Sequence, residues 1–145
     1  MARDGYQWWL DRIRASLELF DAVRIDHFRG FESYYAIPYG EVTARNGKWV
    51  KGPGKGLIAA IKQSFPNVQI IAEDLGFLTQ EVKELLSYSG FPGMKIIQFA
   101  FDSREKSDYI PFKYSRNCVV YTGTHDNETT LGWYRDVIAS NGANL

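Results

Sequence analysis

The chain has 145 residues, close to the roughly 150 of one average domain. Its 45% hydrophobic and 23% charged content is that of an ordinary globular protein, and 17 basic residues balance 17 acidic ones. This balance argues against a nucleic acid or an anionic membrane surface as partner. No apolar run approaches the roughly 20 residues of a membrane span.

The cysteine and histidine content limits the chemistry further. Cys118 is the single cysteine, so the sequence has no internal disulfide and fits a reducing compartment. The N-terminus lacks the basic and then apolar layout of a signal peptide. With two histidines and one cysteine, a metal cage is not expected. We therefore expect a cytoplasmic protein without a metal site.

The first element is predicted to be an amphipathic helix over about 5–20. Asp4 and Gln7 have the spacing of an N-cap and its capping-box partner, and apolar residues then recur at helical spacing. A short apolar strand over 22–25 follows after almost no linker. The chain thus begins as a helix followed by a buried strand.

The next segment contains a hairpin signal and a chain break. Asn46-Gly47 lies between 42–45 and 48–51, which predicts a hairpin of these two runs. Gly52-Pro53-Gly54 then interrupts the chain before a second amphipathic helix.

The rest of the chain alternates strands with helices. Three further apolar strands are predicted, and one helix lies between Thr79 and Gly90 while another begins near Thr129. Such alternation specifies an α/β fold with a parallel sheet and right-handed crossovers. The three predicted strands cover 68–72, 94–101 and 118–121, with a polar segment over 102–117.

The stretch Val23–Gly30 carries the strongest chemical signal. Arg24 and Asp26 lie two residues apart at the end of a strand, so both side chains point to the same side. A guanidinium beside a carboxylate favours its charged form and lowers its pKa. Asp26 is therefore predicted to be a nucleophile or a cation stabiliser; a purely structural ion pair is the alternative.

Acidic residues end three of the four predicted strands, namely Asp26, Glu73 and Asp126. Catalytic groups at the ends of several strands build the active sites of (β/α)₈ barrels. The alternative is that acidic residues at strand ends cap the following helices, which applies most to Asp126.

Carboxylates without metal ligands suit a reaction with a transient cation, such as glycosidic bond exchange. Asp26 would attack the sugar. Glu73 follows an apolar run whose partial desolvation would raise its pKa, as a general acid requires. Asp126 would hold the ring hydroxyls, with His125 as its hydrogen-bond partner.

Five spaced segments resemble one known family: RIDHFRGFESYYAIP, KWVKGPGKGL, IIAEDLGFLTQEV, PGMKIIQFAF and VVYTGTHDNETTLGW. The family is that of the 4-alpha-glucanotransferases, also called amylomaltases or disproportionating enzymes, glycoside hydrolase family 77 of the alpha-amylase clan. The resemblance covers about Tyr6 to Tyr134.

The resemblance implies a role for each matched residue. Asp26 would be the nucleophile, Glu73 the general acid/base and Asp126 the stabiliser of the transition state. Substrate binding would fall to the remaining matched residues, which are Arg24, His125, Asn127 and Phe99.

The resemblance also implies the reaction. Such enzymes cut an α-1,4-glucan, hold part of it covalently and transfer it to the 4-hydroxyl of another glucan, with retention and without any cofactor. The substrates would be maltooligosaccharides derived from starch or glycogen. Retention places the two acting carboxyl groups about 5–5.5 Å apart.

A complete barrel takes about 250 residues, and this chain supplies four strands. By resemblance they are the fourth to the seventh, so residues 1–145 are interpreted as a fragment of one catalytic barrel domain, inactive alone. The alternatives are an α-glucan hydrolase of the amylase type, a non-catalytic carbohydrate-binding fragment and a barrel enzyme with Mg²⁺ on its acidic strand ends.

Overall fold

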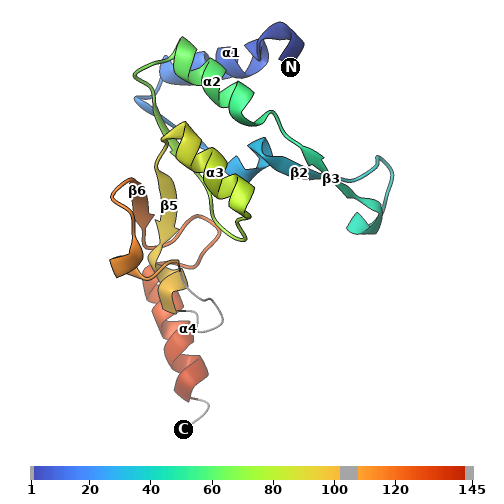
Figure 1. The fold of residues 1–145 in the computed structure, drawn as a ribbon. Coiled ribbons are helices and arrows are strands. Elements are labelled where there is room, and N and C mark those ends of the chain that lie inside the picture. Colours follow the sequence, from blue (N-terminus) through green and yellow to red (C-terminus); the bar gives the residue numbers. More distant parts are fainter. Residues whose placement is uncertain (1, 102–107, 143–145) are drawn as a thin grey trace. The chain divides into compact units, whose positions relative to one another are not determined.

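The computed structural model describes residues 2–101 and 108–142. The chain forms two compact units, Met1–Gly93 and Met94–Leu145 (Figure 1). Part of the expected polar segment, at 102–107, lies outside the described residues. Within the described ranges, none of the helices is long and apolar enough to cross a membrane.

The first unit is built on a parallel strand pair. β1 and β4 run parallel, with Val23 opposite Ile70 and Ile25 opposite Ala72. Parallel neighbours need a long crossover, which here includes a hairpin and a helix. The predicted α/β alternation with parallel strands is confirmed for this pair. In order, the elements are α1 (Gln7–Leu17), β1 (Ala22–Ile25), β2 (Ser33–Ala36), β3 (Lys48–Lys51), α2 (Gly54–Ser64), β4 (Gln69–Ala72) and α3 (Gln80–Ser89).

The core of this unit lies between the strand pair and the helices. Leu57, Ile58 and Ile61 form the apolar face of α2, and each is fully buried. Burial of such a side chain contributes about 1.5–3 kcal/mol. The same cluster includes residues of α1, β1, β4 and α3, namely Leu10, Ile13, Ile25, Ile70, Ala72 and Leu85.

The start of α1 differs from the predicted capping box. The N-cap is Tyr6, in the left-handed conformation with φ 64°, and it follows Gly5 with φ 65°. This left-handed turn separates Asp4 from the helix, so the Asp4 carboxylate accepts the Tyr6 N–H at 3.1 Å. The Gln7 amide donates instead to Asp11. The capping-box prediction is therefore wrong, although the helix exists.

The predicted hairpin is wrong in its first strand. β3 pairs antiparallel with β2, with Tyr35 opposite Trp49, whereas Ala44–Asn46 is a short 3₁₀ helix. A Cβ at Gly47 would lie 2.3 Å from the Tyr35 ring. The glycine is thus required because an aromatic ring packs on its backbone, which a turn rule does not detect.

The second unit contains β6 (Cys118–Tyr121), α4 (Thr130–Gly142) and β5 (Gly93–Ile96) apart from its first residue, and β5 pairs with β6. The predicted strand 94–101 is too long, because Ile97–Phe101 forms a 3₁₀ helix. The Gln98 N–H donates to the Thr122 carbonyl at 3.2 Å and its side chain donates to the Glu128 carbonyl at 3.1 Å. These bonds turn the chain out of the strand.

The strands of the described residues pair as β1–β4, β2–β3 and β5–β6. A single sheet of four parallel strands, as the sequence predicts, is therefore not confirmed. One hydrogen bond of the first unit, from the Ala72 N–H to the Pro92 carbonyl at 2.9 Å, joins the end of β4 to the residue before β5.

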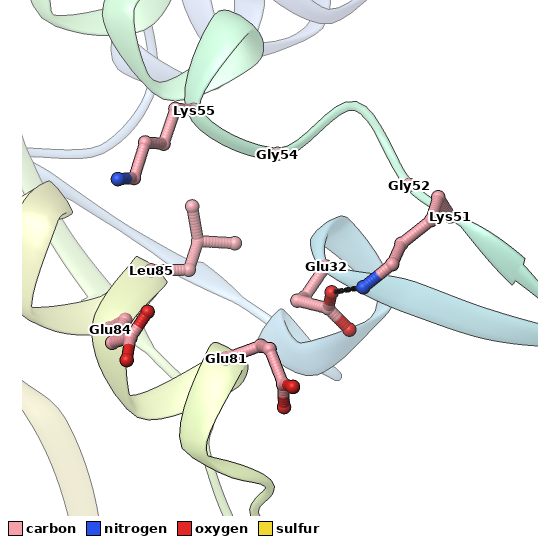
Figure 2. A pocket seen from close by; sticks show the side chains of 8 residues that line it. All are labelled: Glu32, Lys51, Gly52, Gly54, Lys55, Glu81, Glu84 and Leu85. Carbon is pink, nitrogen blue, oxygen red and sulfur yellow. Dashed lines mark hydrogen bonds and ion pairs between the residues drawn. The ribbon is translucent and has the colours of Figure 1, made fainter.

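The base of the β2–β3 hairpin is held by Glu32. Its side chain is 12% exposed and forms an ion pair with Lys51, and it accepts the Ser33 hydroxyl at 2.5 Å. The Lys51 hydrogen bond, followed by that of Ser33, lowers the pKa of Glu32 below its ordinary 4.5, against the opposing effect of burial. Figure 2 shows this ion pair beside a cavity of about 240 Å³, lined also by Gly52, Gly54, Lys55, Glu81, Glu84 and Leu85.

We expect Gly52→Ala to destabilise the protein by about 1–3 kcal/mol. A Cβ at Gly52 would lie 2.4 Å from the Phe31 carbonyl oxygen and 2.6 Å from that of Gly30, and backbone cannot move aside cheaply. The matched control is Gly132→Ala in α4, where the nearest atom is the end of the exposed Glu128 side chain. Urea unfolding should show Gly132→Ala neutral or stabilised; equal losses in both variants would contradict the argument.

We expect acid to weaken the hairpin base through Glu32. Because its pKa is lowered in the folded state, the stabilisation is fully present above the unfolded pKa of 4.5 and is lost as the pH falls through the lower folded pKa. Glu32→Gln should be less stable at pH 7 and should lose that part of the pH dependence. Thermal unfolding between pH 7 and pH 3, with the exposed Glu84→Gln as control, measures both effects; an unchanged pH profile in Glu32→Gln would contradict them.

Candidate active site

The first part of the site is an ion pair at the end of β1. Arg24 Nη2 donates to Asp26 Oδ1, which confirms that both side chains lie on the same side of the strand. The Asp26 side chain is 73% exposed and that of Arg24 is 32% exposed. An exposed pair contributes little to stability, about 0–1 kcal/mol. Its main effect is to fix Oδ1 and leave the carboxylate open to solvent.

Glu73 lies beside this pair because the two parallel strands end together. Ile25 is opposite Ala72 in the register, so Asp26 and Glu73 each follow the last residue of their strand. The Glu73 N–H donates to the Ile25 carbonyl and the Phe28 N–H donates to the Glu73 carbonyl, both at 2.9 Å. Asp26 and Glu73 therefore lie at the same end of the strand pair.

Backbone amides also hold the Glu73 carboxylate. The His27 N–H donates to Oε2 at 2.6 Å and the Leu75 N–H donates to Oε1 at 2.8 Å. Glu73 is half-buried, as the apolar run before it predicts. Its carboxylate has a defined orientation, with one backbone donor on each oxygen.

His27 contacts the candidate residue Glu73, although the sequence analysis does not select it. Its backbone is left-handed, with φ 48° and ψ 53°, which costs a residue other than glycine roughly 1–2 kcal/mol. The next residue, Phe28, is fully buried. The chain thus passes from the exposed Asp26 to a core anchor within two residues. The available signal was weak: histidine is moderately enriched in this conformation.

Arg29 is a second residue that the sequence analysis missed. Its Nη1 donates to the Phe77 carbonyl at 2.8 Å, and its guanidinium lies 4.6 Å from the centre of the Trp49 ring. Arg29 thereby joins the loop after Glu73 to the hairpin that follows β1. Arg29 lies in a short 3₁₀ helix, Phe28–Phe31, and its local sequence carries no signal for such distant contacts.

Asp126 and His125 lie in the second unit. His125 Nε2 is 3.5 Å from Asp126 Oδ1, and the side chains are 73% and 81% exposed. Thr129 caps α4, because its hydroxyl accepts the Gly132 N–H at 3.1 Å and its carbonyl accepts the Trp133 N–H at 2.8 Å. The alternative role of Asp126, as the N-cap of the last helix, is therefore not favoured.

Asn127 and Phe99 have structural contacts in the second unit. The Asn127 side-chain oxygen accepts the N–H and the hydroxyl of Thr124 at 2.8 and 2.9 Å. The Phe99 ring packs edge-on against Tyr109 at 5.1 Å between ring centres. Asn127 therefore fixes the turn that carries His125 and Asp126.

The structure thus brings Arg24, Asp26 and Glu73 together in the first unit, and His125, Asp126 and Asn127 together in the second. The convergence of these two groups on one substrate stays a prediction. Among the residues that the structure describes, no group of three or more His, Cys, Asp or Glu side chains is arranged to hold a metal ion.

Comparison with known proteins gives consistent results. The profile of the 4-alpha-glucanotransferase family, glycoside hydrolase family 77, matches residues 1–144. The chain is 58% identical over 138 residues to a 4-alpha-glucanotransferase of Streptococcus pneumoniae, covering 95% of this chain and 27% of that protein. It is 54% identical over 134 residues to that of Clostridium butyricum, covering 92% of this chain and 28% of that protein.

A solved structure shows the same relationship. The amylomaltase from Streptococcus agalactiae, in complex with acarbose, matches with a TM-score of 0.88 and 40% identity over 98% of this chain and 29% of that one. The chain spans between a quarter and a third of the length of these relatives. The predicted resemblance is confirmed: the chain belongs to the 4-alpha-glucanotransferase family, glycoside hydrolase family 77.

Proposed function

We propose that this chain carries the catalytic centre of a retaining 4-alpha-glucanotransferase. The observation that supports this most directly is the placement of Asp26 and Glu73 at the same end of a parallel strand pair, joined through backbone hydrogen bonds. Two carboxylates at the ends of neighbouring strands are what a retaining glycosidic transfer requires as nucleophile and acid/base.

The first half-reaction breaks the α-1,4 bond. Glu73 donates a proton to the departing glycosidic oxygen while Asp26 attacks the anomeric carbon and forms a glycosyl ester. Arg24 occupies Oδ1 of Asp26, so Oδ2 is the attacking oxygen. In the second half-reaction Glu73 takes the proton of the acceptor 4-hydroxyl, and the new oxygen displaces Asp26 with net retention.

The second unit supplies the remaining groups in this proposal. Asp126 and His125 bind ring hydroxyls and stabilise the oxocarbenium-like transition state, and Asn127 and Phe99 contribute to substrate binding. In a retaining transfer the carboxyl groups of Asp26 and Glu73 would be about 5–5.5 Å apart. The reaction needs no metal and no organic cofactor.

We further propose that residues 1–145 are the part of a (β/α)₈ barrel that contains its fourth to seventh strands, and that a longer chain supplies the rest. The support is the share of the relatives that this chain covers, 27–29%. The substrates would be α-1,4-glucans such as maltooligosaccharides; the related amylomaltase structure holds acarbose. We propose a cytoplasmic location for this protein. The potato relative, by contrast, is named chloroplastic/amyloplastic.

The test is product analysis on maltotriose with the full-length protein and with residues 1–145 alone. We expect the full-length protein to release glucose together with longer maltooligosaccharides, without inhibition by a chelator, and the isolated segment to be inactive. Shorter sugars alone would identify a hydrolase. Transfer by the isolated 145 residues would contradict the proposal that the rest of the barrel is required.

Substitution of the two carboxylates should separate their roles. We expect Asp26→Asn to abolish transfer, because no glycosyl ester forms. Glu73→Gln should lower kcat by about 10²–10⁴-fold, the usual contribution of general acid–base catalysis, with a smaller loss for a substrate with an acidic leaving group. Glu84→Gln on α3 is the matched control. Full activity in Glu73→Gln would refute its assignment.

A further inference from the structure

His27, which lies between Asp26 and the buried Phe28, connects the two proposed catalytic carboxylates. His27 directly follows Asp26, and its N–H donates to Glu73 Oε2 at 2.6 Å. The next amide, that of Phe28, donates to the Glu73 carbonyl at 2.9 Å. Two successive amides therefore bond to the side chain and to the backbone of one residue.

The left-handed backbone of His27 makes this possible. With φ 48° and ψ 53° it turns the chain between the two amides, while Phe28 is fixed in the core and is fully buried. In an extended or right-handed residue the two N–H groups would have a different relative direction. The position of Oε2 relative to Asp26 thus depends on a conformation that few residue types adopt readily.

The imidazole of His27 lies near Gly30, whereas the backbone N–H of the same residue bonds to Glu73. A Cβ at Gly30 would lie 3.0 Å from His27 Nδ1, so the ring lies over its own turn, and the residue as a whole is exposed. The turn is closed by the Gly30 N–H, which donates to the His27 carbonyl at 2.9 Å. The ring does not take part in the bond to Glu73.

We infer that His27 is a positioning residue for the transfer reaction, which acts through its left-handed backbone rather than through its imidazole. This inference rests on the proposed function. The residue fixes the acid/base carboxylate beside the nucleophile, so its effect falls on kcat. Substrate affinity, which depends on groups that contact the sugar, changes little.

The experiment ranks substitutions by how well they adopt the left-handed conformation. His27→Asn and His27→Gly adopt it readily, whereas the β-branched His27→Val does not. In the full-length protein acting on maltotriose, we expect the Asn and Gly variants to keep kcat within about threefold. We expect His27→Val to lose roughly 10–100-fold in kcat with KM nearly unchanged, the usual cost of a small misplacement. Rescue by Asn separates backbone from imidazole chemistry.

The chain offers a matched control at Tyr6. It is the other described residue besides glycine with a positive φ, at 64°, and it caps α1 away from the carboxylates. Tyr6→Val and Tyr6→Asn should both lower the unfolding temperature, because the Tyr6 ring packs against the core, with the larger loss in Tyr6→Val, and both should leave kcat unchanged. If His27→Val does not fold, His27→Ala takes its place, with a several-fold lower kcat than His27→Gly.

The outcomes separate this inference from the proposed function. If the wild-type protein transfers glucan but Asn and Val at position 27 lower kcat equally, the imidazole is the acting group and the inference is overturned. If all position-27 variants match the wild type, it is overturned as well. If the wild-type protein shows no transfer at all, the proposed function fails first and takes the inference with it.

Discussion

The site depends on the register of two short parallel strands. Because Ile25 lies opposite Ala72, the residues that follow, Asp26 and Glu73, come together without any contact between distant loops. A shift of one residue would turn every side chain of a strand to the other face. The apolar side chains of β1 and β4 fix that register, since Ile25 and Ile70 are buried in the core. Packing of the core thus determines the placement of the charged groups.

The elements predicted correctly from the sequence are those that depend on residues close together in the chain. Ala22–Ile25 and Cys118–Tyr121 were predicted with their observed bounds, because a short apolar run between polar residues is a strand signal in itself. Gly90 ends α3 in the left-handed conformation, with φ 73°, as a C-terminal glycine predicts. The pairing of Arg24 with Asp26 followed from side-chain alternation alone, and the family from the spaced motifs.

Apart from the capping box, which a local left-handed turn at Gly5 and Tyr6 displaces, the errors in the strands arise from contacts between residues far apart in sequence. β3 pairs with β2 rather than with the predicted run 42–45, because Tyr35 packs on Gly47. The strand predicted over 94–101 ends at Ile96, because Gln98 bonds to Thr122 and Glu128. His27 was missed since its importance lies in an amide and a dihedral angle, which a residue name does not encode. The convergence of Asp126 on the other two carboxylates stays a prediction.

Arg29 has one further consequence. It bonds to the carbonyl of Phe77 and stacks on Trp49, and so it couples two surface segments that leave different strands. Movement of either segment away from the other would break one of these two contacts. One guanidinium therefore restrains the segment after β4 and the β2–β3 hairpin together.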